Sequence, residues 1–312
     1  MVYKMRKKLL QLIEQQIQDK EYHGATLALF DQGKWQEYYI GTTDGKCPVK
    51  PGLVYDLASV SKVVGVGTIC IFMINSGALD LDASLTKYYP SFHDDRVTLR
   101  QLLTHTSGLD PYIPNRDQLD AVQLKEAMNQ LTVTSDKTFH YTDVNFLLLG
   151  FMLQEVTGKS LDQLFTEEVF EPFGMTKTTF GPRTEAVPTV NGVNDGFVHD
   201  PKAKVLGNHA GSAGLFSTVK DLELFLNHYM EDDFAQNLFQ NYSQQVKERS
   251  IAWRLEKNNW LDHTGYTGPF IMFNDRKQAA VFLTNRTYDK DDRAHWIEVR
   301  DLVMQVIKDS FK

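Results

Sequence analysis

The sequence has little cysteine and no apolar stretch long enough for a membrane span. Only Cys47 and Cys70 occur among its 312 residues, which is too few for a disulfide framework. Cys70 lies in an apolar run, where a buried and unreactive thiol is expected. That run covers residues 63–74, and a membrane span needs roughly 20 residues. The sequence therefore predicts no membrane span.

Positive charge is also in short supply. There are 33 Lys and Arg residues against 40 Asp and Glu, and the formal net charge is -7. Because an acidic surface repels phosphate backbones, we expect no nucleic-acid partner. The nine histidines show no metal-ligand spacing such as His-Glu-x-x-His, and no Gly-rich phosphate loop is present. We expect neither a metal nor another cofactor.

The first residues, "MVYKMRKKLLQLIEQQIQDK", are basic but do not form a signal peptide. The apolar core "LLQLI" is too short, and polar residues follow at once. Leu10, Ile13 and Ile17 fall on one helical face, which indicates an amphipathic helix. We expect a cytoplasmic protein, and an extracytoplasmic one only if a leader is missing from this sequence.

Strand patterns occur at both ends of the chain and helical patterns in between. "ATLALFD" and "WQEYYIGT" flank a turn at 32–34, and "IAWRLE", "GPFIMFN" and "QAAVFLTN" come near the end. "VTLRQLLTH" and "VNFLLLGFMLQEVTG" are helical, and residues 181–214 have a loop composition. The predicted fold is of the α/β (α+β) class, with one antiparallel sheet built from both chain ends and flanked by helices. We expect a domain of residues 1–60 and 215–312, an inserted helical domain of 61–214, and a site in the cleft between them.

A Ser-x-x-Lys pattern occurs three times, beginning at Ser59, Ser84 and Ser217. Only Ser59 leads into a buried helix, whereas Ser84 follows a polar loop and Ser217 resembles a helix cap. The spacing places the Lys62 amine beside the Ser59 hydroxyl. An amine in apolar surroundings has a lowered pKa and can accept a proton. The structural alternative is a capping serine followed by a lysine that extends to solvent.

Two further segments carry polar groups next to buried elements. In "HYTDVNFLLLG", Tyr141 precedes a buried helix, and Thr142 and Asp143 are natural caps for it. In "DHTGYTGPFIMFN", His263 precedes a glycine that allows close approach of a substrate backbone, and a strand follows. Taken alone, the first segment is an ordinary helix start and the second an ordinary loop before an edge strand.

Together these segments resemble the serine β-lactamase and penicillin-binding protein superfamily. The resemblance is to its class C branch, which includes D-alanyl-D-alanine peptidases and β-lactamase-fold esterases. It extends over residues 20–290 and includes "ALDLDASLTKYYPSF", "VTLRQLLTHTSGL" and "HAGSAGLFSTVKDLELF". The resemblance implies a β-lactamase/transpeptidase-like fold and acyl transfer through a covalent acyl-enzyme.

The resemblance also implies roles for individual residues. Ser59 is expected to be the acylated nucleophile and Lys62 its hydrogen-bonded partner, while Tyr141 shares or relays the proton. Asp143 is a supporting residue at a position where the second motif usually has Asn. His105 is expected to be structural, and His209 has no assigned role.

The third motif, usually Lys-Thr-Gly, corresponds here to His263, Thr264 and Gly265, which are expected to bind substrate. The oxyanion hole implied is made by the backbone N–H groups of Ser59 and Tyr266. A histidine, whose ordinary pKa is near 6.5, would be only a partial cation at neutral pH.

The two departures from the family pattern, at positions 143 and 263, weaken the case for an efficient β-lactamase. The Asp143 charge should hold Lys62 more strongly as an ammonium. We expect a serine hydrolase of small esters or amides. The alternatives are a penicillin-binding D-alanyl-D-alanine carboxypeptidase or a weak class C-like β-lactamase. A rival of another class is a catalytically weak protein that binds or senses an acyl-D-amino acid or a β-lactam. The expected partner is a small-molecule ester, amide or β-lactam, and the oligomeric state stays open.

Overall fold

The two ends of the chain meet in one antiparallel sheet. The computed structural model describes residues 2–311. Its six-stranded sheet has the order β2-β1-β9-β8-β7-β6, and each neighbouring pair is antiparallel. The strands are β1 Gly24–Asp31, β2 Lys34–Gly41, β6 Arg254–Glu256, β7 Trp260–Thr264, β8 Phe270–Asn274 and β9 Ala279–Leu283. The join is made by β1 against β9, where Thr26 faces Leu283. The expected sheet and fold class are confirmed.

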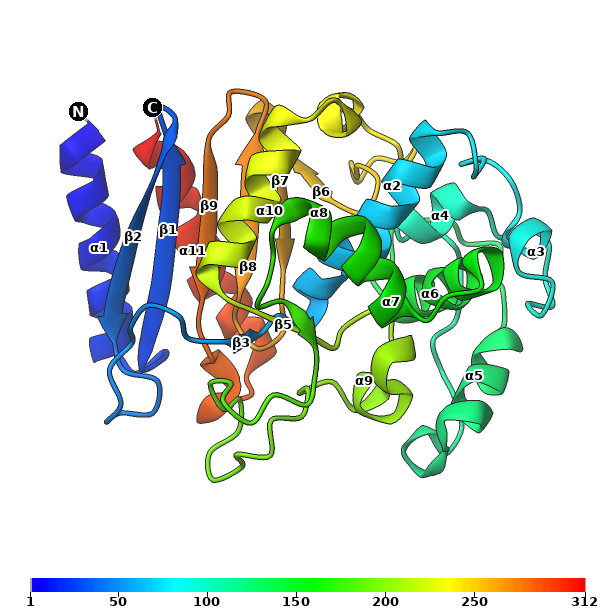
Figure 1. Cartoon of the computed structure of the whole chain (residues 1–312), viewed down its shortest axis with the longest axis horizontal. Helices are drawn as coiled ribbons and strands as arrows, with labels where there is room; N and C mark the ends of the chain where they lie inside the picture. The colour runs from blue at the N-terminus through cyan, green and yellow to red at the C-terminus, as the bar shows by residue number, and fades with distance from the viewer. Residues whose placement is uncertain (1, 312) are drawn as a thin grey trace.

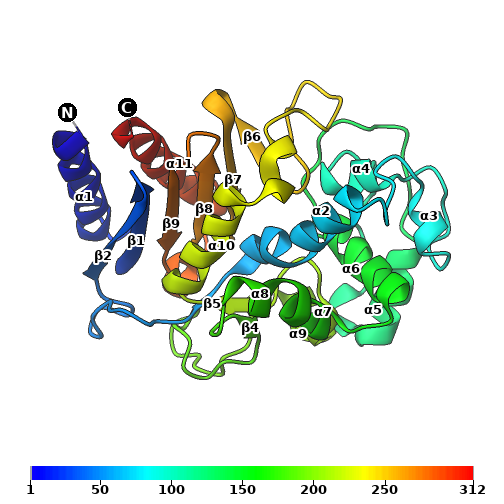
Figure 2. The same cartoon turned by 45° about the horizontal axis from the view of Figure 1, so that its top comes forward.

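Helices cover both faces of this sheet (Figures 1 and 2). The terminal helices α1 (Val2–Gln18) and α11 (Arg293–Ser310) pack together and share one core cluster with Leu27 and Leu29. Helix α10 (Val219–Glu231) contacts β1, β8 and β9 from the other side. Because side chains alternate along a strand, Ala28 and Phe30 join the second core cluster instead. On α1 from residue 5 onward, the buried residues are Leu9, Ile13 and Gln16, and the predicted Leu10 and Ile17 are only partly buried.

The rest of the chain forms a helical region beside the sheet (Figure 2). A small second sheet joins β3 (Tyr55–Asp56), β5 (Leu215–Ser217) and β4 (Thr179–Phe180). The remaining helices are α2 Thr68–Asn75, α3 Leu85–Tyr88, α4 Leu99–Leu103, α5 Ala121–Asn129, α6 Val144–Thr157, α7 Leu161–Phe165, α8 Glu171–Phe173 and α9 Pro201–Leu206. The loop prediction for 181–214 is wrong at α9, which the Gly- and Asn-rich flanks obscure. The division at residues 60 and 215 stays a prediction.

The apolar run behind Ser59 is a composite helix in the centre of the protein. A 3₁₀ turn (Ala58–Val60) leads into a π-helix (Val63–Gly67) and then into α2. By length and composition the segment Ala58–Asn75 could cross a membrane, and 72% of it is buried inside the fold. The sequence prediction counted only residues 63–74 and therefore underestimated the length of this apolar helical segment. Gly65 permits this burial, because a Cβ there would lie 2.3 Å from the Phe165 ring.

Candidate active site

Ser59 lies in a tight turn that a buried carboxylate holds in place. Ala58, the residue before it, has a φ of 44°, which is strained for a residue with a side chain. The Asp56 carboxylate accepts a hydrogen bond from the Ala58 backbone N–H at 2.8 Å. Burial raises the pKa of Asp56 to about 6, although backbone donors from His199 and Ala58 oppose the rise. The hydrogen bond to Asp56 thus stabilises the strained backbone next to Ser59, which lines the pocket.

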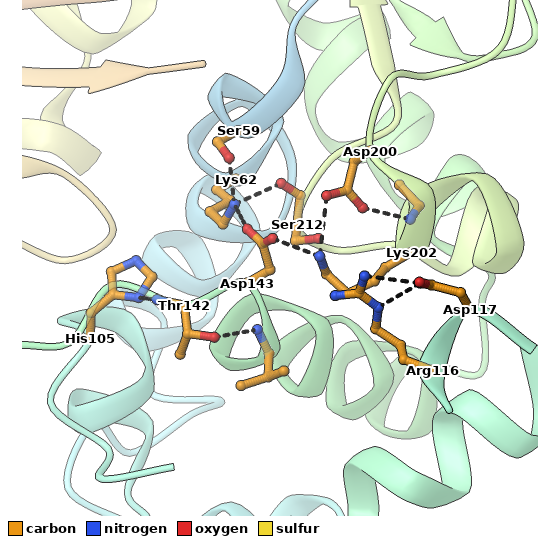
Figure 3. Close-up of polar contacts among 12 residues, drawn as sticks. Ser59, Lys62, His105, Arg116, Asp117, Thr142, Asp143, Asp200, Lys202 and Ser212 are labelled. Atoms are coloured by element: carbon orange, nitrogen blue, oxygen red, sulfur yellow. Dashed lines mark hydrogen bonds and ion pairs between the residues drawn. The ribbon is translucent and has the colours of Figure 1, made fainter. Parts of the chain in front are cut away.

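Lys62 is fully buried and donates three hydrogen bonds (Figure 3). Its Nζ lies 2.8 Å from Ser59 Oγ, 2.7 Å from Asp143 Oδ1 and 2.9 Å from the Ser212 carbonyl oxygen. Burial is the largest single influence and would lower the pKa of Lys62, but its interactions with Asp143 and then Tyr141 together outweigh burial and raise it. The lysine is therefore an ammonium. The expectation of a lowered pKa was wrong, and the competing expectation, that Asp143 holds the charge, is confirmed.

Asp143 stands at the N-cap position of α6 without capping it. Its side chain makes no cap hydrogen bond, and its two oxygens bind Lys62 and the Lys202 Nζ, the latter at 3.0 Å. Burial would raise the pKa of Asp143, but these two ammonium groups hold it well below its usual range. The capping alternative for Asp143 was therefore wrong, because two cations outcompete a backbone N–H for this carboxylate.

Tyr141 lies close to both the ammonium of Lys62 and a buried histidine. Lys62 Nζ is 5.3 Å from the centre of the Tyr141 ring, a cation–π distance. The His105 ring centre lies 4.4 Å from the centre of the Tyr141 ring. His105 Nδ1 is 2.9 Å from the amide nitrogen of Asn145. Burial holds the pKa of His105 well below its ordinary value. This neutral ring positions Tyr141, consistent with a structural role for His105.

His263 belongs to a strand rather than to a loop. It lies in β7, and the next strand, β8, is paired on both sides, so the simplest alternative, a loop histidine before an edge strand, was wrong. The side chain is buried, and neither ring nitrogen has a hydrogen-bond partner among the described residues. Burial, then the charges of Lys62 and Arg249, hold the pKa of His263 well below its ordinary value. His263 is neutral at pH 7, so the expectation of a partial cation was wrong.

Thr264 and Gly265 continue the pocket wall after His263. A Cβ at Gly265 would lie 2.7 Å from the Leu57 carbonyl oxygen, so only glycine fits between this strand end and the turn of Ser59. Tyr266 also lines the pocket, and its hydroxyl donates to Asp291 at the rim. The predicted oxyanion groups, the backbone N–H of Ser59 and of Tyr266, thus belong to two segments that face one cavity.

The cavity has a volume of about 700 Å³ and mixed charge. It brings together every site residue predicted from the sequence except the buried Lys62, which lies directly behind Ser59. Its charged lining residues are Lys202, Lys247, Arg249, Arg254, Arg293 and Arg300 together with Asp143, Asp200, Asp262, Asp291 and Asp301. Six cations against five carboxylates make this cavity slightly positive within an acidic protein.

Sequence reasoning identified none of these six cations, and Arg249 and Lys202 are the two that matter most for the site. Arg249 is buried, and its Nε and Nη2 have no hydrogen-bond partner within residues 2–311. Burial lowers the pKa of Arg249 to about 10, which leaves it charged. No local signal marks either residue, because a lone Arg in "QVKERS" and a lone Lys in "DPKAK" look like ordinary surface charges.

The other two Ser-x-x-Lys serines have structural partners elsewhere. Ser84 accepts a hydrogen bond from the Thr86 backbone and begins α3. Ser217 ends β5 and shares a hydrogen bond with Thr178, while Thr218 caps α10. Neither Ser84 nor Ser217 is on the described wall of the cavity.

Comparison with known proteins places the chain in one family. Residues 9–304 match the family model described as Beta-lactamase. An Escherichia coli K12 protein named "Putative D-alanyl-D-alanine carboxypeptidase" is 25% identical over 318 residues, which cover 80% of this chain and 73% of that protein.

Solved structures show the same fold. A class C beta-lactamase has a TM-score of 0.77 at 20% identity, covering 99% of this chain and 97% of its own. A beta-lactamase/D-alanine carboxypeptidase from Pseudomonas syringae has a TM-score of 0.76 at 18% identity, covering 96% and 98%. The family match extends over nearly the whole chain, and the chain therefore belongs to the beta-lactamase family of serine hydrolases.

Proposed function

We propose that Ser59 is the nucleophile of an acyl-enzyme mechanism. The observation that carries this proposal is the 2.8 Å hydrogen bond from the Lys62 ammonium to Ser59 Oγ. A positive charge at that distance stabilises the negative charge that develops on Oγ during attack. Because Lys62 already carries its proton, another group must take the proton of Ser59.

Tyr141 is the group proposed for that proton transfer. Ser59 Oγ bonds to the substrate carbonyl carbon while its proton passes to the Tyr141 oxygen. The proton of Tyr141 passes to the leaving alcohol or amine, whose bond to the carbonyl carbon breaks. Backbone N–H groups of Ser59 and Tyr266 hold the carbonyl oxygen meanwhile. In the second half, a water oxygen bonds to the acyl carbon while its proton passes to the Tyr141 oxygen. The proton of Tyr141 passes to Ser59 Oγ, whose bond to the acyl carbon breaks, and the carboxylic acid is released.

The proposed substrates are small esters or amides that carry a carboxylate. Arg249 supports this, because it is a cation on the cavity wall with no carboxylate partner within residues 2–311, and a guanidinium binds a carboxylate well. The same observation favours a second candidate, D-alanyl-D-alanine carboxypeptidase, whose substrate ends in a carboxylate. The relatives that bear this name are consistent with it.

Paired substrates test the proposal. A nitrophenyl ester with a carboxylate and its neutral methyl-ester counterpart should both be turned over, the first with the higher kcat/KM. Arg249→Met should remove most of the difference without changing the neutral ester. Release of D-alanine from an acylated D-alanyl-D-alanine would establish the second candidate. Binding of both esters without turnover would instead support the rival sensing protein.

A further inference from the structure

One carboxylate, that of Asp143, lies between two ammonium groups. Its Oδ1 is 2.7 Å from Lys62 Nζ and its Oδ2 is 3.0 Å from Lys202 Nζ. Figure 3 shows the chain from Ser59 through Lys62 and Asp143 to Lys202. Because each carboxylate oxygen of Asp143 binds a different lysine, Asp143 cannot bind Lys62 through both oxygens.

Lys202 is itself fixed in place by the chain around it. It lies in the first turn of α9, and its Nζ is 3.3 Å from Oδ2 of the N-cap residue Asp200. Three residues earlier, the His199 backbone N–H donates to Asp56 Oδ2 at 2.7 Å. The other oxygen of Asp56 holds the turn before Ser59. The Lys202 segment and the nucleophile turn are thus tied to the same buried carboxylate.

We propose that Lys202 is a positioning residue for acylation: it engages one oxygen of Asp143, so that Lys62 keeps a proton directed at Ser59. Without Lys202, both carboxylate oxygens would be free to bind Lys62 and draw its ammonium away from the serine. Without the Asp143 charge, two ammonium groups would face each other with no shared anion, which is unfavourable at short range. Lys202 and Asp143 therefore compensate each other. This inference rests on the proposed acylation of Ser59.

A double-mutant cycle tests the compensation. The rate constant of acylation by a fluorophosphonate would be measured for Lys202→Met, Asp143→Asn and the double variant. Each single change should slow acylation at least about 10-fold. The double variant should react at least about 10-fold faster than it would if the two losses simply multiplied. Lys202→Arg, which keeps the charge, should retain most of the rate, a rescue that a purely structural role would not require.

Lys204→Met is the matched control. Lys204 lies on the same helix, is half exposed and pairs with Asp195 at 3.4 Å, so its removal should leave the rate unchanged. Losses that simply multiply in the double variant, or full activity in Lys202→Met, would overturn the role of Lys202. If Lys202→Met fails to fold, Lys202→Gln serves in the same cycle.

A second readout separates this inference from the proposed function. Melting temperatures should show the same coupling, with Lys202→Met lowering Tm in the wild type and much less in the Asp143→Asn background. A wild type that is never acylated refutes the proposed function. If the wild type is acylated but the rate losses of the two single variants multiply and their Tm changes add, only the inference about Lys202 is refuted.

Discussion

Lys62 keeps its positive charge although none of its side chain reaches solvent. Desolvation on this scale disfavours a charge, and three acceptors within 2.9 Å compensate for it. A lysine in this state can stabilise an oxyanion but cannot take the first proton. In the proposed mechanism, Lys62 therefore stabilises the charge on Ser59 and Tyr141 transfers its proton.

Lys62→Met and Tyr141→Phe should each lower the acylation rate by about 10²–10⁴-fold, the usual effect of removing a proton-transfer or charge-stabilising group. Both variants should fold, because Asp143 keeps Lys202 as a partner when Lys62 is removed. Rates of fluorophosphonate labelling and circular dichroism would measure the two effects. An undiminished rate in Tyr141→Phe would remove Tyr141 from the mechanism.

His263 should make no contribution to pH dependence between about pH 6 and 8. Its pKa lies well below 6.5 in the folded protein, so the ring stays neutral above that lowered pKa. The ratio of kcat/KM for a carboxylated ester to that for its neutral counterpart cancels the groups that both reactions share. This ratio should be flat over that range.

His263→Lys is the comparison for this profile. A lysine adds a cation to the cavity and should raise the ratio for carboxylated esters at neutral pH. A wild-type ratio that falls between pH 6 and 8 would show that His263 is charged there after all.

Short elements separate what sequence patterns can predict from what they cannot. The β1–β2 hairpin and α6 were predicted closely, because alternation and a long apolar run ending at Gly158 are strong local signals. Strand β7 was missed, because "WLDHT" has only five residues and its polar members Asp262 and His263 become buried only when the sheet forms. Asp262, for example, is held by Arg254 at 2.7 Å.

Helix α10 carries a buried glutamate whose ionisation should weaken its packing on the sheet. Burial raises the pKa of Glu223 to about 7, although Lys220 at 2.9 Å opposes the rise. Because this folded-state pKa lies above the unfolded value, Glu223 is most favourable to stability at low pH and loses that advantage as pH rises through about 7. Glu223→Gln should therefore raise Tm relative to wild type at pH 8, and the difference should shrink by pH 5.

Glu231→Gln provides the control on the same helix. Glu231 is exposed and pairs with Lys277 on the surface, so its replacement should give no such pH-dependent change in Tm. A Glu223→Gln protein that is less stable than wild type at pH 8 would mean that the carboxylate is stabilising as an anion.

The whole molecule shares one continuous core between the sheet and the helical region. One cluster of buried residues includes Phe30 of β1, Val281 of β9 and Leu148 of α6. The sequence predicted the sheet from both chain ends and the helical insertion, because each follows from local periodicity. It could not predict the Asp143–Lys202 pair or the burial of Arg249 beside the cavity, which depend on residues brought together only by the fold.

Because the core is continuous, unfolding in urea should be a single cooperative transition. Tryptophan fluorescence and far-UV circular dichroism should give the same midpoint. Two separated midpoints would mean that the helical region and the sheet unfold independently.

The central claim is that Ser59 alone is acylated. Intact-protein mass spectrometry after fluorophosphonate treatment should show one adduct, and peptide mapping should place it on Ser59. Ser59→Ala should remove the label, whereas Ser84→Ala and Ser217→Ala should retain it, since both serines make structural hydrogen bonds away from the cavity. A label on Ser84 or Ser217, or one that persists in Ser59→Ala, would contradict the account.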